Sequence, residues 1–187
     1  WYDDRMYRGE ELEGEYKGLS RIQLYEKLGC SDRLYYFNAC MEAKLDPSIK
    51  SWSRPAGERR TELIMETPVG TVNSIVESNA SNPGVMPIKW WVEEEKDLEV
   101  FSFIEETTEY SFNMERYEQM CQEMGHLGLP SMFVPRVNMQ HMIVTLSGVI
   151  NTVYLLNDST DAVESFFKSL SIGQEKMMKV AAECPIE

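Results

Sequence analysis

The sequence lacks the features that would mark a membrane-spanning, secreted or metal-cluster protein. No apolar run approaches the roughly 18–20 residues that a membrane-spanning helix needs. The four cysteines, Cys30, Cys40, Cys121 and Cys184, form no C-x-x-C or C-x-C pair, so neither a metal site nor a disulfide framework is indicated. Reduced thiols are typical of cytoplasmic proteins, and we expect that location here.

Basic charge is also scarce. The 187 residues carry 31 acidic and 18 basic side chains, which gives a formal net charge of −13. An acidic surface repels phosphate backbones and anionic lipids, so we expect neither a nucleic-acid nor a membrane partner. A small anionic substrate would therefore need a local basic pocket.

The chain begins with Trp1-Tyr2-Asp3-Asp4, without an initiator Met and without the layout of a signal peptide. It contains no internal repeat and no low-complexity tract. Its length suffices for one core. We expect residues 1–187 to form a single domain that is part of a longer gene product.

Five segments have the apolar spacing and the terminal residues of helices. Ser20 is an N-cap candidate before the first, and Gly29 suits the position after its end. Asn113 is the corresponding cap candidate for the third. The predicted helices are 19–29, 93–107, 114–128, 138–156 and 159–183.

Aromatic or apolar runs predict short strands at Arg33–Ala39 and Leu129–Val134. Residues 46–57 are rich in Pro, Ser and Gly, which predicts a loop. Residues 58–79 predict a hairpin that turns at 67–70, because Pro presets one turn dihedral and Gly tolerates positive φ. A short extended piece follows at 88–92. This order favours an α/β fold of parallel β/α units with an inserted hairpin.

Polar side chains follow the predicted strand Leu129–Val134 at the place where α/β proteins bind ligands. Arg136 could clamp a carboxylate through its planar guanidinium, or it could form a surface ion pair. His141 could transfer protons near neutral pH, or it could simply pack on a helix face. Together with Asn138, these residues make the segment our first candidate for a site.

Four segments in order resemble the uroporphyrinogen decarboxylase-like superfamily: TPVGTV (67–72), EEEKDLEVFSFIEETTEY (93–110), LPSMFVPRVNMQHMIVTLSG (129–148) and INTVYLLNDSTDAVESFFKSL (150–170). That superfamily contains the decarboxylase of haem biosynthesis and the cobalamin-linked methyltransferases, and its fold is a (β/α)8 TIM-type barrel. Such a barrel needs about 250 residues. The resemblance therefore implies an N-terminal part of a barrel, with the hairpin as an excursion.

The resemblance also assigns positions. His141 falls where the decarboxylase has a substrate-facing Tyr, and Arg136 and Asn138 belong to the same element. Arg5 and Arg8 lie where two arginines hold substrate carboxylates, although the surrounding motif is not reproduced. Asn38 stands where a key Asp is found, and the loss of that carboxylate argues against a true uroporphyrinogen decarboxylase.

The resemblance thus implies methyl transfer with a corrinoid partner protein, in which Arg136, Asn138 and His141 shape the donor pocket. Zinc, where such enzymes use it, is held mostly by later parts of the barrel, beyond Glu187. One alternative is a lyase that decarboxylates uroporphyrinogen in tetrapyrrole biosynthesis. Another is a non-catalytic ligand-binding or assembly module. An incomplete barrel leaves apolar faces open, so we also expect self-association.

Overall fold

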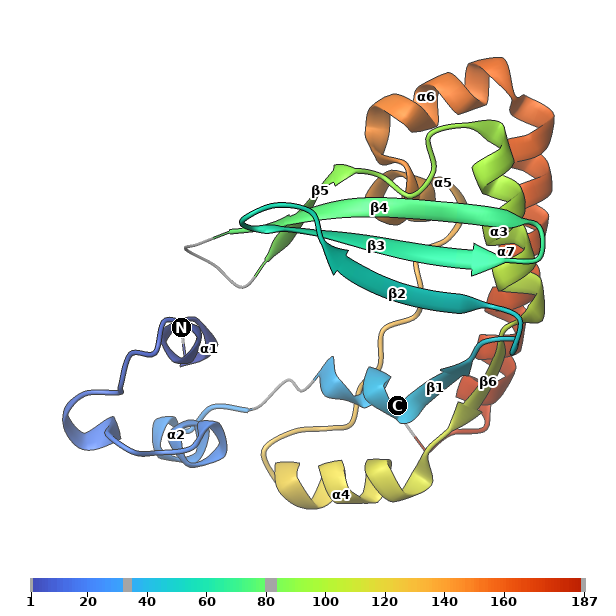
Figure 1. The fold of residues 1–187 in the computed structure, drawn as a ribbon. Helices are drawn as coiled ribbons and strands as arrows, with labels where there is room; N and C mark the ends of the chain where they lie inside the picture. The colour runs from blue at the N-terminus through green and yellow to red at the C-terminus, as the bar shows by residue number, and fades with distance from the viewer. Residues whose placement is uncertain (1, 32–34, 80–83, 186–187) are drawn as a thin grey trace.

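The computed structural model describes residues 2–31, 35–79 and 84–185 (Figure 1). The protein is mixed α/β, with 50% helix, 21% strand and two small sheets. The helices are α1 (Tyr2–Tyr7), η1 (Gly14–Tyr16), α2 (Arg21–Leu28), η2 (Tyr35–Cys40), α3 (Glu95–Thr107), α4 (Met114–Met124), α5 (Asn138–His141), η3 (Met142–Leu146), α6 (Gly148–Asp158) and α7 (Thr160–Ala182). The strands are β1 (Met41–Lys44), β2 (Lys50–Pro55), β3 (Arg60–Thr67), β4 (Gly70–Ser78), β5 (Val85–Lys89) and β6 (Glu109–Phe112).

The larger sheet is antiparallel, in the order β2-β3-β4-β5. The predicted hairpin is confirmed as β3 and β4, which close at the pair Thr67–Gly70. The prediction of a loop at 46–57 is wrong for β2, because this edge strand pairs with β3 over its whole length. An edge position tolerates Pro55 and many polar side chains. Cross-strand ion pairs, such as Arg54 Nε–Glu62 Oε2 at 2.6 Å, add to the pairing.

Two long helices stand together at one end of the larger sheet and supply much of the main core (Figure 1). α3 and α7 lie against each other, and α3 also contacts β4. The acidic first turn of α3 is held by Asp97, whose Oδ2 accepts from the backbone N of Glu93 and Glu94 at 3.0 and 3.1 Å. The buried core residues are Val72, Val92, Leu98, Val100, Phe101, Ile104, Met142, Leu146, Leu155, Val163, Phe166 and Leu170.

The second sheet pairs β1 with β6, and η2 packs with α4 beside it. The strand predicted at Arg33–Ala39 is wrong for the residues that the structure describes, because Tyr35–Cys40 form a 3-10 helix. Residues 33 and 34 of the prediction lie outside the described residues. Phe37 and Cys40 are three residues apart and both fully buried. A 3-10 helix places such positions on one side, whereas a strand would turn them to opposite faces.

No strand forms at Leu129–Val134, because this segment pairs with no other strand among the described residues. The helix expected over 138–156 is broken into α5, the π-helix η3 and α6. The break falls at Gly148, whose φ is +68°. Trp90 packs so closely there that a Cβ on Gly148 would lie 2.6 Å from Trp90 Cε2. A side chain from before α3 therefore decides where α6 starts.

The sheets of the described residues contain antiparallel pairs only, and these residues form no closed barrel. The expectation of parallel β/α pairing is therefore not met in this part of the chain. None of the helices in the described ranges has the length and apolarity to span a bilayer.

Candidate functional site

The segment between α4 and α5, which we call the site loop (129–137), is fixed at two points. Asn38 of η2 donates from Nδ2 to the carbonyl O of Phe133, and its Oδ1 accepts from the Phe133 N, both at 2.8 Å. Gln174 of α7 donates from Nε2 to the carbonyl O of Arg136 at 2.8 Å. A segment without sheet partners thus gains a defined path from side-chain hydrogen bonds.

Arg136 presents its side chain to solvent at the end of the site loop. Within the part of the chain that the structure describes, no carboxylate forms an ion pair with its guanidinium, although the protein carries 31 acidic residues. The alternative of a surface ion pair is therefore not what the structure shows. The guanidinium is available to a planar anion such as a carboxylate or a phosphate.

Asn138 begins α5 with a φ of +44°, the one positive φ outside glycine in the described residues. Asparagine tolerates this left-handed region better than most residues. The sharp change of direction lets α5 start directly after the site loop. Asn138 itself is exposed, as is Arg136 two positions before it.

His141 ends α5 and is half-buried, next to the fully buried Met142. Burial lowers the pKa of His141, and the positive charge of Arg136 lowers it further. The imidazole is consequently neutral at pH 7 and can accept a proton. A neutral histidine beside an unpaired guanidinium provides one base and one anion-binding group.

The turns after His141 depart from α-helical geometry. Residues Met142–Leu146 form a π-helix, a conformation that is rare and often found at functional sites. Ser147 closes it, since its backbone N donates to Met142 O at 2.8 Å and its Oγ lies 2.7 Å from Thr152 Oγ1. This closure and the packing of Trp90 on Gly148 flank η3, whose Met142 and Leu146 are buried in the core.

The other predicted site residues lie elsewhere. Arg5 belongs to α1, which Figure 1 shows on the far side of the molecule from α5, and it pairs with Glu10 and Glu13 at 3.2 Å each. Arg8 follows directly after α1. The structure therefore does not bring these arginines to Arg136. Asn38 does reach the site loop, but both ends of its amide are engaged by the Phe133 backbone.

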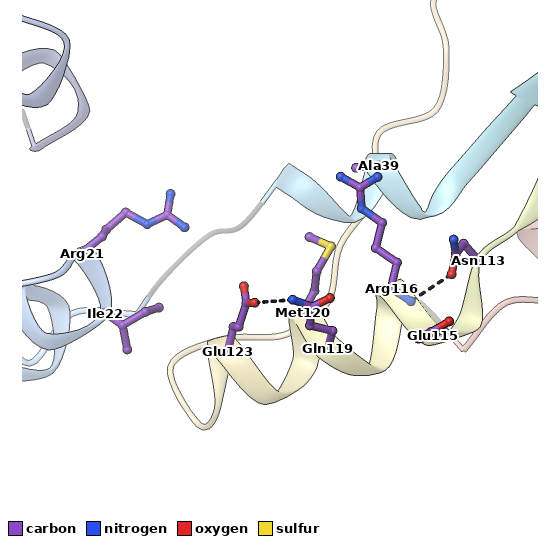
Figure 2. Close-up of a pocket in the computed structure, with 9 residues that line it drawn as sticks. All are labelled: Arg21, Ile22, Ala39, Asn113, Glu115, Arg116, Gln119, Met120 and Glu123. Carbon is purple, nitrogen blue, oxygen red and sulfur yellow. Dashed lines mark hydrogen bonds between the residues drawn. The ribbon is translucent and has the colours of Figure 1, made fainter.

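A separate cleft of about 710 Å³ lies between α2 and α4 (Figure 2). Arg116 of α4 directs its guanidinium toward Ala39, and no carboxylate of the described residues forms an ion pair with it. Glu123, also on α4, accepts from Gln119 Nε2 at 2.9 Å. The lining residues are Arg21, Ile22, Ala39, Asn113, Glu115, Arg116, Gln119, Met120 and Glu123.

No group of three His, Cys, Asp or Glu side chains in the described part of the chain has the arrangement of a metal site. The groups present at the site loop suit recognition of an anion and proton transfer.

Sequence reasoning found Arg136, Asn138 and His141 because these residues lie within six positions of one another in the sequence. It missed Gln174, because the residue that Gln174 contacts, Arg136, is 38 positions away in the sequence. It also missed Arg116, because nothing in the sequence around this residue indicates a cleft.

Comparison with protein families, with curated proteins and with solved structures finds no match to this chain.

Proposed function

We propose that the chain is part of an enzyme of the uroporphyrinogen decarboxylase-like superfamily that transfers a methyl group with a corrinoid partner protein. The proposal rests on the four sequence segments that resemble this superfamily. The observation that carries it is the pair of Arg136 and His141: an exposed, unpaired guanidinium just before α5 and a neutral, half-buried imidazole at the end of α5.

In this proposal the two side chains act on a small methyl donor. Arg136 would bind an anionic group of the donor through its two parallel N–H groups. His141 would exchange a proton with the heteroatom that carries the methyl group. Asn138 would donate to the donor from its exposed amide. The corrinoid supplies the centre to which or from which the methyl group moves.

The finer expectation for the fold belongs to the same proposal: the site loop would serve as a strand of a larger (β/α)8 barrel. The Asn38 amide binds both the N–H and the C=O of Phe133, as a neighbouring strand would. This favours an extended segment, in which the carbonyl of Arg136 is also bound, by Gln174. In this proposal the site loop would form one wall of a barrel mouth.

Decarboxylation of a tetrapyrrole carboxylate is the second candidate, because Arg136 would suit a carboxylate substrate equally well. Equilibrium dialysis against a methylated corrinoid and against uroporphyrinogen, kept anaerobic, distinguishes the two. Dialysis avoids the overlap between corrinoid absorption and tryptophan fluorescence. Binding of the corrinoid alone supports methyl transfer, and binding of the porphyrinogen alone supports the lyase.

The variant Arg136→Ala tests whether the site loop is responsible, and Arg59→Ala on the distant hairpin is the matched control. We expect Arg136→Ala to weaken binding about tenfold or more, as loss of a charged hydrogen bond does. Arg59→Ala should leave binding unchanged. If neither ligand binds and Arg136→Ala is silent, both enzymatic readings fail, which leaves a non-catalytic binding or assembly module.

A further inference from the structure

Cys40 and Cys121, 81 positions apart in sequence, come together in one apolar cluster. Cys40 ends η2 and is fully buried, and its Sγ lies 3.6 Å from the Sδ of Met120 on α4. The next residue of α4, Cys121, is half-buried and packs against the cluster that Phe37, Cys40 and Met124 form. Two thiols from different segments thus share one neighbourhood, which we call the thiol pair.

The cleft between α2 and α4 lies next to this pair, although neither thiol is itself among the lining residues. Two residues of its lining, Ala39 and Met120, are the chain neighbours of Cys40 and Cys121 (Figure 2). Arg116 lies one helical turn before Met120 and has no carboxylate partner in the described part of the chain. Burial raises the pKa of Cys40, and the charge of Arg116 acts against that rise. The Arg116 guanidinium, which lines the cleft, therefore stands close to the buried Cys40 thiol behind the cleft wall.

We propose that Cys40 and Cys121 are a redox-responsive thiol pair, which a small anionic disulfide entering the cleft between α2 and α4 converts into an intramolecular disulfide. The guanidinium of Arg116 would attract carboxylates on such a molecule. The lining carries two charges of each sign, because Glu115 and Glu123 line the cleft together with Arg21 and Arg116. Oxidised glutathione, which carries several carboxylates, has the required chemistry.

The reaction proceeds in two balanced exchanges. The half-buried Cys121 loses its proton and attacks one sulfur of the small disulfide, which forms a mixed disulfide and releases one small thiolate. Cys40 then loses its proton and attacks Cys121 Sγ, which releases the second small thiolate. The protein gives up two electrons and two protons, and one small disulfide becomes two small thiols. The second exchange accelerates at higher pH, because burial raises the pKa of the Cys40 thiol.

The disulfide would tie η2 to α4 beside the site loop. Asn38, which holds Phe133 of the site loop, stands two residues before Cys40. Oxidation would therefore restrict the segment that fixes the loop. This role goes beyond the proposed function and does not depend on it, since it concerns only the thiols and the cleft.

Cys184 offers a competing partner. The chain end lies against α4, because Tyr117 Oη donates to Pro185 O at 2.9 Å. However, the Cys184 Sγ donates to Val180 O at 3.0 Å, which holds it at the end of α7. Cys184 also contributes to the raised pKa of Cys40, so it is the competitor that the test has to exclude. Cys30 is exposed and stands apart from the cluster, and it serves as the internal control.

The test treats the folded chain with oxidised glutathione, blocks remaining thiols by alkylation under native conditions, and maps disulfides by peptide mass spectrometry. We expect a Cys40–Cys121 link in the wild-type chain and in Cys184→Ser, and none in Cys121→Ser, whose fold is checked by circular dichroism. In Cys121→Ser, Cys40 should stay reduced. A link that joins either thiol to Cys184, or modification confined to Cys30, would overturn the proposal.

The role of the cleft has its own measurement. Arg116→Gln should slow oxidation by glutathione disulfide several-fold while leaving oxidation by the uncharged 2-hydroxyethyl disulfide unchanged. Arg54→Gln on the distant β2 is the matched control and should affect neither reagent. Equal slowing with both reagents, or no slowing with either, would remove Arg116 and the cleft from the mechanism.

Discussion

Asn38 and Phe133 are joined by a reciprocal pair of hydrogen bonds of 2.8 Å, although 95 positions separate them in the sequence. The Asn38 amide offers one donor and one acceptor, and the Phe133 backbone offers the complementary two. A carboxylate at position 38 could accept from the Phe133 N but could not donate to its carbonyl. The asparagine is therefore suited to holding the site loop in a way that an aspartate is not.

Asn38→Asp should lower the free energy of unfolding by about 1–2 kcal/mol at pH 7, because it loses a donor and sets two oxygens against each other. The loss should shrink at low pH, where a protonated carboxyl can donate again. Chemical denaturation at both pH values measures this. Asn151→Asp on α6 is the control, because it adds the same charge at a side chain for which the described structure shows no hydrogen bond. It should lower the free energy of unfolding much less than Asn38→Asp does. Equal losses in the two variants would mean that charge alone is responsible.

The capping signals in the sequence were reliable because they are local. Ser20 forms the expected capping box with Gln23, and Gly29 takes the left-handed conformation after α2. Asn113 caps α4 through the backbone N of Arg116 at 2.9 Å. Each of these interactions spans at most four residues, so one sequence contains all the information needed.

The errors occurred where distant partners decide the conformation. β2 is a strand because β3 pairs with it, and nothing within 46–57 reveals that partner. The helix expected over 138–156 is interrupted at Gly148, where Trp90 from outside that range packs closely. In the site, the order of Arg136 and His141 was visible in the sequence, whereas the support from Asn38 and Gln174 was not.

Arg136→Ala should raise the pKa of His141, most clearly at low salt, because it removes a nearby positive charge. The pKa should still remain below 6.5, since burial is the larger cause of the lowering. Proton NMR titration of the imidazole signals measures both values. The chain has 2 histidines, so His126 provides an internal reference, and His126→Asn assigns the signals. An unchanged His141 pKa would show that the guanidinium does not act on it.

Gly148→Ala should lower the free energy of unfolding by about 2–4 kcal/mol, because it adds backbone strain to a clash with Trp90. The two contributions can be separated. Gly29 has a similar φ of +64°, and a Cβ there would meet nothing within 4 Å. Gly29→Ala should therefore show the cost of strain alone, about 1–2 kcal/mol. If the two variants cost the same, the packing of Trp90 on Gly148 does not determine where α6 begins.

Glu105 should make stability depend on pH between about 4.5 and about 7. Burial raises the pKa of this carboxyl to about 7, from the usual 4.5. Its carboxylate lies against α7, where a Cβ on Gly173 would meet it, and it faces Tyr110. As pH rises through this window, the unfolded chain releases the proton while the folded chain keeps it. The stabilisation present below pH 4.5 is thus lost by about pH 7.

Glu105→Gln removes this ionisation and should raise the free energy of unfolding at pH 8 by about 2–3 kcal/mol, with little effect at pH 4. The exposed Glu99 on the same helix gives the control Glu99→Gln, which should change little at either pH. Denaturation curves at a series of pH values give the difference between each variant and the wild type. A Glu105→Gln chain with the same pH dependence as the wild type would show that this carboxyl ionises normally in the fold.

Self-association remains a prediction, and the structure locates the surface on which it depends. Apolar side chains of the site loop and of one face of α6 are exposed: Leu129, Phe133, Val134, Val137, Val149, Ile150, Val153 and Tyr154. Ile150 is 71% exposed and Val153 59%, which is costly for side chains of this kind. Sedimentation should show an average mass that rises with protein concentration.

The paired change Ile150→Lys and Val153→Lys should shift sedimentation toward the monomer. Both lysines make the net charge of −13 less negative, which by itself would favour association. A shift toward monomer would therefore report the loss of apolar contact rather than a gain in repulsion between chains. Met86→Lys on β5, where the native side chain is 68% exposed, should have a smaller effect. A wild-type chain that sediments as a monomer at every concentration would contradict the prediction.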